Sequence, residues 1–150
     1  MSEHRASVQW RRNTDNFDAT NYNREHRWKF AGGVEIPAAS APEFRGDPAC
    51  VDPEEAFVAS ISSCHMLTFL YLAALDGFTI DSYKDDAVGY LKPQGKKLAV
   101  TKVELRPKIV FSGETQPNAE QLESLHHRAH EECFIANSVN TVIEVKPSED

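Results

Sequence analysis

The residues best suited to chemistry in this chain are two cysteines in apolar surroundings. Cys64 lies within a run from Ala56 to Leu75 that contains no Lys, Arg, Asp or Glu, and Cys133 follows the segment LHHRAHEE. A cysteine reacts as its thiolate, and burial among apolar groups opposes ionisation. A lone cysteine in such a setting is usually inert packing. Because 69 positions separate the two thiols, only the fold can bring them together, and a pair brought together could reduce a peroxide.

A thiolate in a dry site needs a cation nearby. The same segment offers only His65, so an arginine must come from elsewhere in the chain. An arginine in a dry site in turn needs a carboxylate, which Glu54 or Glu55 could supply at the start of the segment. The candidate arginines before the segment are Arg24, Arg27 and Arg45.

The position of Glu54 makes a second copy of the chain relevant. Glu54 and Cys64 are ten positions apart, about 15 Å along a straight helix, which a carboxylate side chain cannot span. Either the helix bends or Glu54 comes from a second subunit packed antiparallel. A two-fold dimer brings each helix start beside the middle of the other helix, so the acid–arginine–thiolate arrangement predicts a homodimer.

Composition limits the possible functions. A chain of 150 residues, 41% hydrophobic, predicts one domain, residues 1–150, with a real core. A net charge of -7 without a Lys/Arg-rich run argues against nucleic acid as a partner. Three cysteines do not make a disulfide framework, and the first 17 residues lack the apolar core of a signal peptide; both favour the cytoplasm.

The run from Ala56 to Leu75 is long enough to cross a bilayer. A belt of polar side chains at its middle favours a buried central helix instead, and we expect no membrane partner. The belt consists of Ser60, Ser62, Ser63, Cys64, His65 and Thr68.

The pattern along the chain predicts an α+β fold. Weak strands at residues 7–12 and 28–36, the second broken at Gly32–Gly33, precede a loop at 37–51. A helix then begins with Asp52 and Glu55 as a capping box and stops at Gly77. A hairpin with strands at 79–91 and 98–111 follows, then a helix from Pro117–Asn118 and a strand at 139–145. Residues 1–6 and 147–150 are expected to be frayed.

Two segments carry a resemblance to a known family. PEEAFVASISSCHM and, on the later helix, AHEECFIANS together resemble the OsmC/Ohr family of organic hydroperoxide reductases, over about residues 8–145. The resemblance implies an OsmC-like fold in which two central helices pack with antiparallel sheets in an intertwined homodimer. It also implies that Cys64 attacks the peroxide and that Cys133 resolves the product.

The resemblance further implies the remaining parts of a thiol peroxidase. Glu54 matches the catalytic glutamate of the family, and the arginine falls on Arg24 or Arg45, of which Arg24 is preferred. Attack on an organic hydroperoxide releases an alcohol and leaves a sulfenic acid on Cys64, which Cys133 converts to a disulfide. An external dithiol, of which a lipoyl group is one example, reopens the disulfide, and no other cofactor is required. The apolar residues Met66, Phe69, Phe134 and Ile135 would favour a bulky peroxide.

Other interpretations remain open from the residues alone. His126, His130 and Cys133 have a spacing that can bind zinc, which would make the protein a metal-binding or non-catalytic dimeric module of the same fold. A Cys64–His65 hydrolytic pair is excluded, because neighbouring side chains on a helix diverge by about 100°. Cys50 is expected to be a bystander and His127 a solvated residue.

Overall fold

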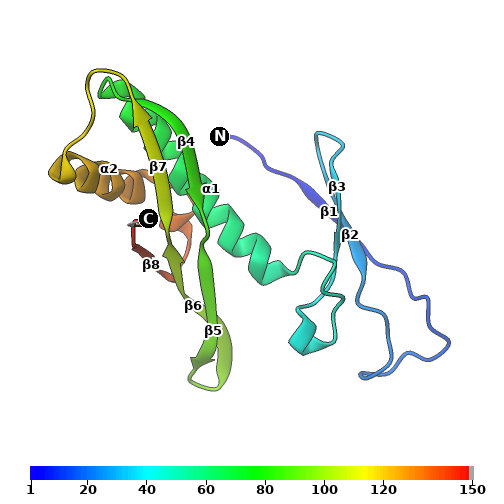
Figure 1. Ribbon diagram of the computed structural model, residues 1–150. Coiled ribbons are helices and arrows are strands. Elements are labelled where there is room, and N and C mark those ends of the chain that lie inside the picture. Colours follow the sequence, from blue (N-terminus) through cyan, green and yellow to red (C-terminus); the bar gives the residue numbers. More distant parts are fainter. Residues whose placement is uncertain (149–150) are drawn as a thin grey trace. The chain divides into compact units, whose positions relative to one another are not determined.

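A computed structural model describes residues 1–148 of the chain. The chain divides into two compact units, Met1–Ala56 and Phe57–Asp150, which are described separately below. Figure 1 shows helices and strands in both. The prediction of a single domain over residues 1–150 stays a prediction.

The first unit contains a small antiparallel sheet in the order β1-β2-β3. Its strands are β1 (Ala6–Gln9), β2 (His26–Phe30) and β3 (Glu35–Ala38). The predicted break at Gly32–Gly33 is the turn between β2 and β3, where Gly33 adopts a φ of 87° that favours glycine. The loop that follows holds a short 3₁₀ helix, η1 (Pro42–Phe44).

The helix α1 (Pro53–Leu75) begins and ends where the sequence predicts. The Asp52 side chain accepts a hydrogen bond from the Glu55 backbone at 2.7 Å, and the Glu55 carboxylate accepts one from the Asp52 backbone at 3.2 Å. This capping box is confirmed. Gly77, with a φ of 83°, follows the last turn.

One stripe of α1 is buried in the second unit, and another apolar stripe is not. The buried stripe comprises Ile61, His65, Phe69, Leu72 and Ala73. On the other side Leu67, Tyr71 and Leu75, at intervals of four residues, are exposed. The helix α1 is long and apolar enough to cross a membrane. This is weak evidence for a membrane span, because core helices of soluble proteins meet the same criterion. The absence of a membrane partner stays a prediction.

The predicted hairpin is present, divided into two strand pairs. β4 (Thr79–Asp85) pairs with β7 (Pro107–Ser112), and β5 (Val88–Gln94) pairs with β6 (Lys97–Leu105), all antiparallel. Along β6, Val103 and Leu105 are fully buried, as their alternation predicts. Glu104, between them on the opposite face of the strand, is also buried, and cations contact its carboxylate.

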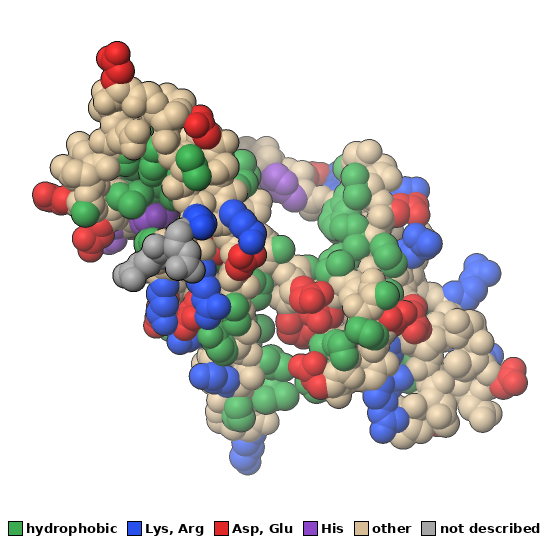
Figure 2. Space-filling model, viewed as in Figure 1, with side chains coloured by type: hydrophobic (Ala, Val, Ile, Leu, Met, Phe, Trp, Pro, Cys, Tyr) green, Lys and Arg blue, Asp and Glu red, His purple; other side chains and the backbone are tan. Residues whose placement is uncertain are grey.

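Glu104 lies at the centre of a charged network on the β5-β6-β8 sheet. Lys102 and Lys146 contact one of its carboxylate oxygens at 2.8 and 2.9 Å, and Arg106 contacts the other at 2.9 Å. These hydrogen bonds, that from Lys102 first, hold the pKa of Glu104 well below its usual range. Figure 2 shows basic and acidic side chains intermixed over this region.

The helix α2 (Ala119–Glu132) has Asn118 as its N-cap, which forms a capping box with Gln121. The 3₁₀ helix η2 (Ala136–Ser138) leads to β8 (Val142–Val145), which pairs parallel to β6. The N–H of Ser148 donates to the Pro107 carbonyl at 3.0 Å, and the expected fraying of residues 1–6 and 147–150 stays a prediction. Residues 149 and 150 lie outside the described residues.

The second unit has a core in two clusters. Phe69, Leu72 and Phe78 pack with Leu125 and Ala129 of α2 in the first cluster. The second is formed by Ile61, Val103 and Leu105. The α+β fold class is therefore confirmed, with α1 and α2 sharing the core that fixes the relative positions of their cysteines.

Candidate active site

The fold brings the thiols of Cys64 and Cys133 together. Cys64 lies in the middle of α1, and Cys133 is the C-cap of α2. Both are free cysteines. Burial, and then the nearby Cys64 side chain, raises the pKa of the Cys133 thiol to about 11. Cys64 is therefore a near neighbour of Cys133, and their action as a catalytic pair stays a prediction.

The two thiols differ in exposure and protonation. Cys133 is only 1% exposed, and its sulfur accepts a hydrogen bond from the Ala136 backbone at 3.4 Å. Its raised pKa keeps it protonated at neutral pH. Cys64 is only partly buried, which leaves it the more accessible of the two. This arrangement suits a nucleophile at Cys64 and a second thiol poised for disulfide formation.

His65 does not supply the cation that a Cys64 thiolate would need. Its ring is buried, and its Nε2 lies 3.1 Å from His126 Nδ1, with the two rings stacked at 5.4 Å between centroids. Burial, followed by the charges of His126 and His130, lowers the pKa of His65 to about 4. The imidazole is therefore neutral at pH 7 and turned toward α2, so it provides no charge for Cys64, and the cation must come from an arginine elsewhere, as the sequence predicts.

The arginines of the second unit are bonded to carboxylates. Arg106 contacts Glu104, and Arg128 donates to Asp76 at 2.6 Å. Between residues 57 and 148 no other arginine exists. Both arginines of the second unit are therefore already paired with carboxylates.

Arg24 and Arg45 both bind the same turn of the first unit. Arg24 donates to the backbone carbonyls of Tyr22 and Ala19 at 2.6 and 2.9 Å and stacks on the Tyr22 ring. Arg45 donates to the carbonyl of Thr20 at 3.0 Å. The ion pairs found within residues 1–148 include neither arginine. Their catalytic role, and the preference for Arg24, stay predictions.

The two acids at the start of α1 have different surroundings. Glu55 forms the capping box with Asp52, whereas Glu54 is half-buried and takes no part in it. The catalytic role of Glu54 stays a prediction.

Cys50 has an environment that opposes reactivity. Burial, together with the Asp47 and Glu25 carboxylates, raises the pKa of its thiol. This agrees with the expected bystander role.

The histidines do not form a zinc centre with Cys133. Within residues 1–148 no three His, Cys, Asp or Glu side chains converge in a way that could hold a metal ion. His126 bonds to His65, and His127 is exposed and pairs with Glu131 at 3.3 Å. The solvated position predicted for His127 is confirmed, and the predicted three-residue zinc arrangement is not observed.

The residues expected to line a peroxide pocket are divided between core and surface. Phe69 is fully buried in the core cluster, whereas Phe134 is 82% exposed. Phe69 therefore cannot line an open pocket, because it already packs against Tyr83 and His126.

Comparison with known proteins identifies the family. Residues 46–148 match the family described as OsmC-like protein. The chain therefore belongs to the OsmC family, as its two cysteine motifs predict, and it has the OsmC-like fold. No curated protein sequence matches the chain significantly.

Solved structures extend the similarity to nearly the whole chain. An OsmC-like protein of unknown function from Vibrio cholerae is 50% identical, with a TM-score of 0.93, over 98% of this chain and 99% of that one. An organic hydroperoxide resistance protein, OsmC, from Legionella pneumophila is 20% identical, with a TM-score of 0.71, over 99% and 96% of the chains. An organic hydroperoxide resistance protein from Elizabethkingia anophelis is 18% identical, with a TM-score of 0.70, over 99% and 95%.

Proposed function

We propose that the protein is a thiol peroxidase that reduces organic hydroperoxides to alcohols. The observation that carries the proposal is that Cys64, in the middle of α1, lies close enough to Cys133, at the end of α2, to raise the pKa of the Cys133 thiol. Membership of the OsmC family supports a redox role in peroxide resistance. Two structures of the same fold bear the description organic hydroperoxide resistance protein.

Cys64 attacks and Cys133 resolves. The Cys64 thiolate takes the distal oxygen of the hydroperoxide, the O–O bond breaks, and the alkoxide leaves as an alcohol after taking a proton. The Cys64 sulfenic acid then condenses with the Cys133 thiol, which releases water and forms a disulfide. An external dithiol, such as a lipoyl group, exchanges with the disulfide and is itself oxidised while both thiols are restored.

An arginine stabilises the Cys64 thiolate and polarises the peroxide, and Glu54 holds that arginine. Arg24 is our first choice and Arg45 the second. Because α1 is one unbroken helix, Glu54 lies about 15 Å from Cys64 along its axis. We therefore assign Glu54 to the site of a second copy of the chain.

The second copy belongs to an intertwined homodimer. Leu67, Tyr71 and Leu75 form an exposed apolar stripe on α1 of the kind that subunit contacts bury. Replacing Tyr71 by Lys should shift the protein toward monomers in light scattering after size exclusion, whereas Glu114→Lys in an exposed loop should not. An unchanged dimer with Tyr71→Lys, or a wild-type monomer, would contradict the assignment.

The proposed setting is the cytoplasm, with no metal and no nucleic acid involved. The net charge of -7 disfavours nucleic acid. The partners are then an organic hydroperoxide, a dithiol reductant and a second copy of the chain.

The decisive experiment treats the reduced protein with one equivalent of cumene hydroperoxide. Intact mass and free thiols are followed for the wild type, Cys64→Ser, Cys133→Ser and, as the matched control, Cys50→Ser. We expect the wild type and Cys50→Ser to lose two thiols as one disulfide, and Cys133→Ser to stop at the sulfenic acid. Thiols that persist in the wild type would refute the proposal.

A second measurement distinguishes the two arginines. Arg24→Gln and Arg45→Gln are compared for their rates of disulfide formation with the same peroxide. A large loss in only one variant identifies the catalytic arginine, and full rates in both would exclude the proposed role.

A further inference from the structure

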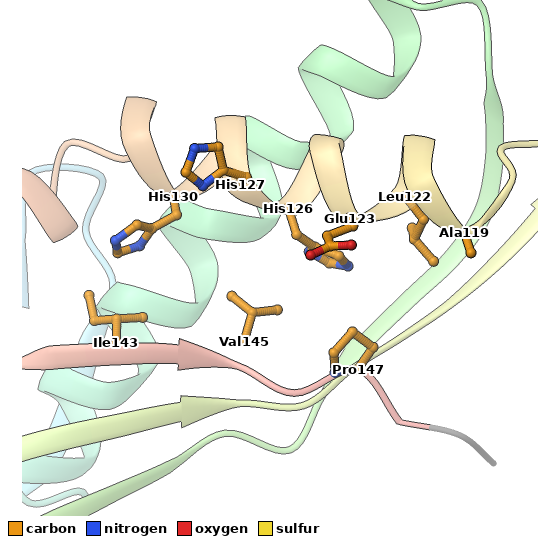
Figure 3. Close-up of a pocket in the computed structure, with 9 residues that line it drawn as sticks. All are labelled: Ala119, Leu122, Glu123, His126, His127, His130, Ile143, Val145 and Pro147. Atoms are coloured by element: carbon orange, nitrogen blue, oxygen red, sulfur yellow. The ribbon is translucent and has the colours of Figure 1, made fainter.

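A cavity lies between α2 and β8, and neither Cys64 nor Cys133 lines it. Its volume is about 490 Å³, a size typical of small-molecule sites. Figure 3 shows side chains of α2 facing those of β8 and the segment after it across this space. The lining residues are Ala119, Leu122, Glu123, His126, His127, His130, Ile143, Val145 and Pro147. Most of the wall is therefore apolar, with imidazoles as its main polar groups.

One wall of the cavity carries a buried ring nitrogen with an unmet hydrogen bond. His126 is only 5% exposed, and its Nε2 has no hydrogen-bond partner within the described residues. One turn later on α2, His130 Nδ1 is also buried without a partner. In Figure 3 both rings extend from α2 toward β8. A buried polar atom without a partner is costly, so a ligand that bonds these nitrogens would be favoured.

The His126 ring is held in place by two residues of α1, His65 and Phe69. Its Nδ1 bonds His65 Nε2 at 3.1 Å, the two rings stack within 8° of parallel, and Phe69 packs against it at 4.5 Å between centroids. Such support is what holds a binding group in one orientation. Depending on which ring donates in the His65–His126 bond, His126 Nε2 is either an acceptor or a donor. A hydroxyl group satisfies both cases, because it can donate and accept.

The charge of the cavity excludes ionic ligands. No Lys or Arg lines it, and Glu123 adds a carboxylate. Burial lowers the pKa of His126 to about 4, so that imidazole is neutral at pH 7. An anion would find no positive charge there, and a cation would have to lose its water against the apolar walls.

We propose that this cavity binds neutral hydroxyl compounds with an apolar body, such as alkylphenols, with the hydroxyl group at His126 and His130. The apolar body lies against Leu122, Ile143 and Val145. The site requires neither cysteine, so it does not depend on the proposed peroxidase activity. Alcohols, the products of that reaction, belong to the same chemical class.

The test measures binding of 4-ethylphenol to the reduced full-length protein by calorimetry and by the ¹⁵N shifts of the histidine rings. We expect the His126 Nε2 signal to move on binding and ethylbenzene, which lacks only the hydroxyl, to bind at least about tenfold more weakly. We expect 4-ethylbenzoate not to bind. Absence of phenol binding, or equal binding of ethylbenzene, would overturn the proposal.

Variants separate the site from its surroundings. His126→Phe keeps a ring of similar size and should weaken phenol binding at least about tenfold, and the less buried His130→Leu should weaken it as well. Glu132→Gln, on the same helix but exposed and outside the cavity lining, should bind as the wild type does. Cys64→Ser should also bind normally, which tests independence from the peroxidase proposal. Unchanged binding in both His126→Phe and His130→Leu would refute the assignment.

Discussion

The buried imidazole pair should make the protein sensitive to mild acid, and His126→Phe should remove part of that sensitivity. Burial lowers the pKa values of His65 and His126 from 6.5 to about 4 in the folded chain. In the unfolded chain both return to about 6.5. Below that pH the two imidazoles bind protons in the unfolded chain but stay neutral in the folded chain until the pH approaches 4. The stability that the neutral rings contribute is thus complete above pH 6.5 and is lost as the pH falls toward 4.

The size of the effect follows from the two pKa values. A difference of one pH unit is worth about 1.4 kcal/mol. At about pH 5, which is about 1.5 units below the pKa in the unfolded chain, each ring lowers the free energy of unfolding by about 2 kcal/mol. The pair costs at most about 4 kcal/mol, because the low pKa of His65 already contains repulsion from His126. On acidification, the free energy of unfolding of His126→Phe should therefore fall by about 2 kcal/mol less than that of the wild type.

The assay is urea unfolding followed by circular dichroism at about pH 7.5 and about pH 5, on either side of the histidine pKa. Protein concentration is held fixed, since subunit association would contribute to stability. For each variant, only the change in the free energy of unfolding between the two pH values is compared, so a loss of stability that is the same at both pH values does not affect the result. His127→Gln, whose ring is exposed, should match the wild type. An acid-induced loss that is the same in His126→Phe and the wild type would refute the reasoning.

Three further predictions concern other parts of the second unit. Iodoacetamide should modify Cys64 well before Cys133, because Cys133 is almost inaccessible and its pKa is raised; equal rates in peptide mass mapping would contradict this. Glu104→Gln should lower the melting temperature, most strongly at low salt, because three cations lose their shared carboxylate; a loss independent of salt would argue against the network. Asn118→Ala should cost about 1 kcal/mol in urea unfolding, because the backbone N–H of Gln121 loses its cap, and Asn118→Asp should retain most of the stability.

The features that could be predicted from sequence are those set by neighbouring residues. The capping box of Asp52 and Glu55 depends on a spacing of three residues, so its residue types alone identify it. The inward face of β6, with Val103 and Leu105, follows from simple alternation. The prediction that Cys64 and Cys133 act as a pair depends on two family motifs that occur together in the chain.

The features that could not be predicted depend on contacts between distant segments. Nothing near His65 indicates that its partner is His126, 61 positions away. The parallel pairing of β8 with β6 also lacks a local signal. An apolar helix does not reveal which of its faces is covered, and for that reason Phe69 was assigned to a pocket although it lies in the core.

The two contacts between α1 and α2 constrain how a disulfide could close. Cys64 and His65 are consecutive on α1, and their partners Cys133 and His126 lie at the end and in the middle of α2. The His65–His126 contact holds the middle of the helices at a fixed separation. The sulfurs of Cys64 and Cys133 must approach to about 2.05 Å to form an S–S bond. Cys64 lies within a continuous helix, whereas Cys133 lies just past the last turn of α2. We therefore expect that, when the disulfide forms, Cys133 and the segment that leads into η2 move toward Cys64.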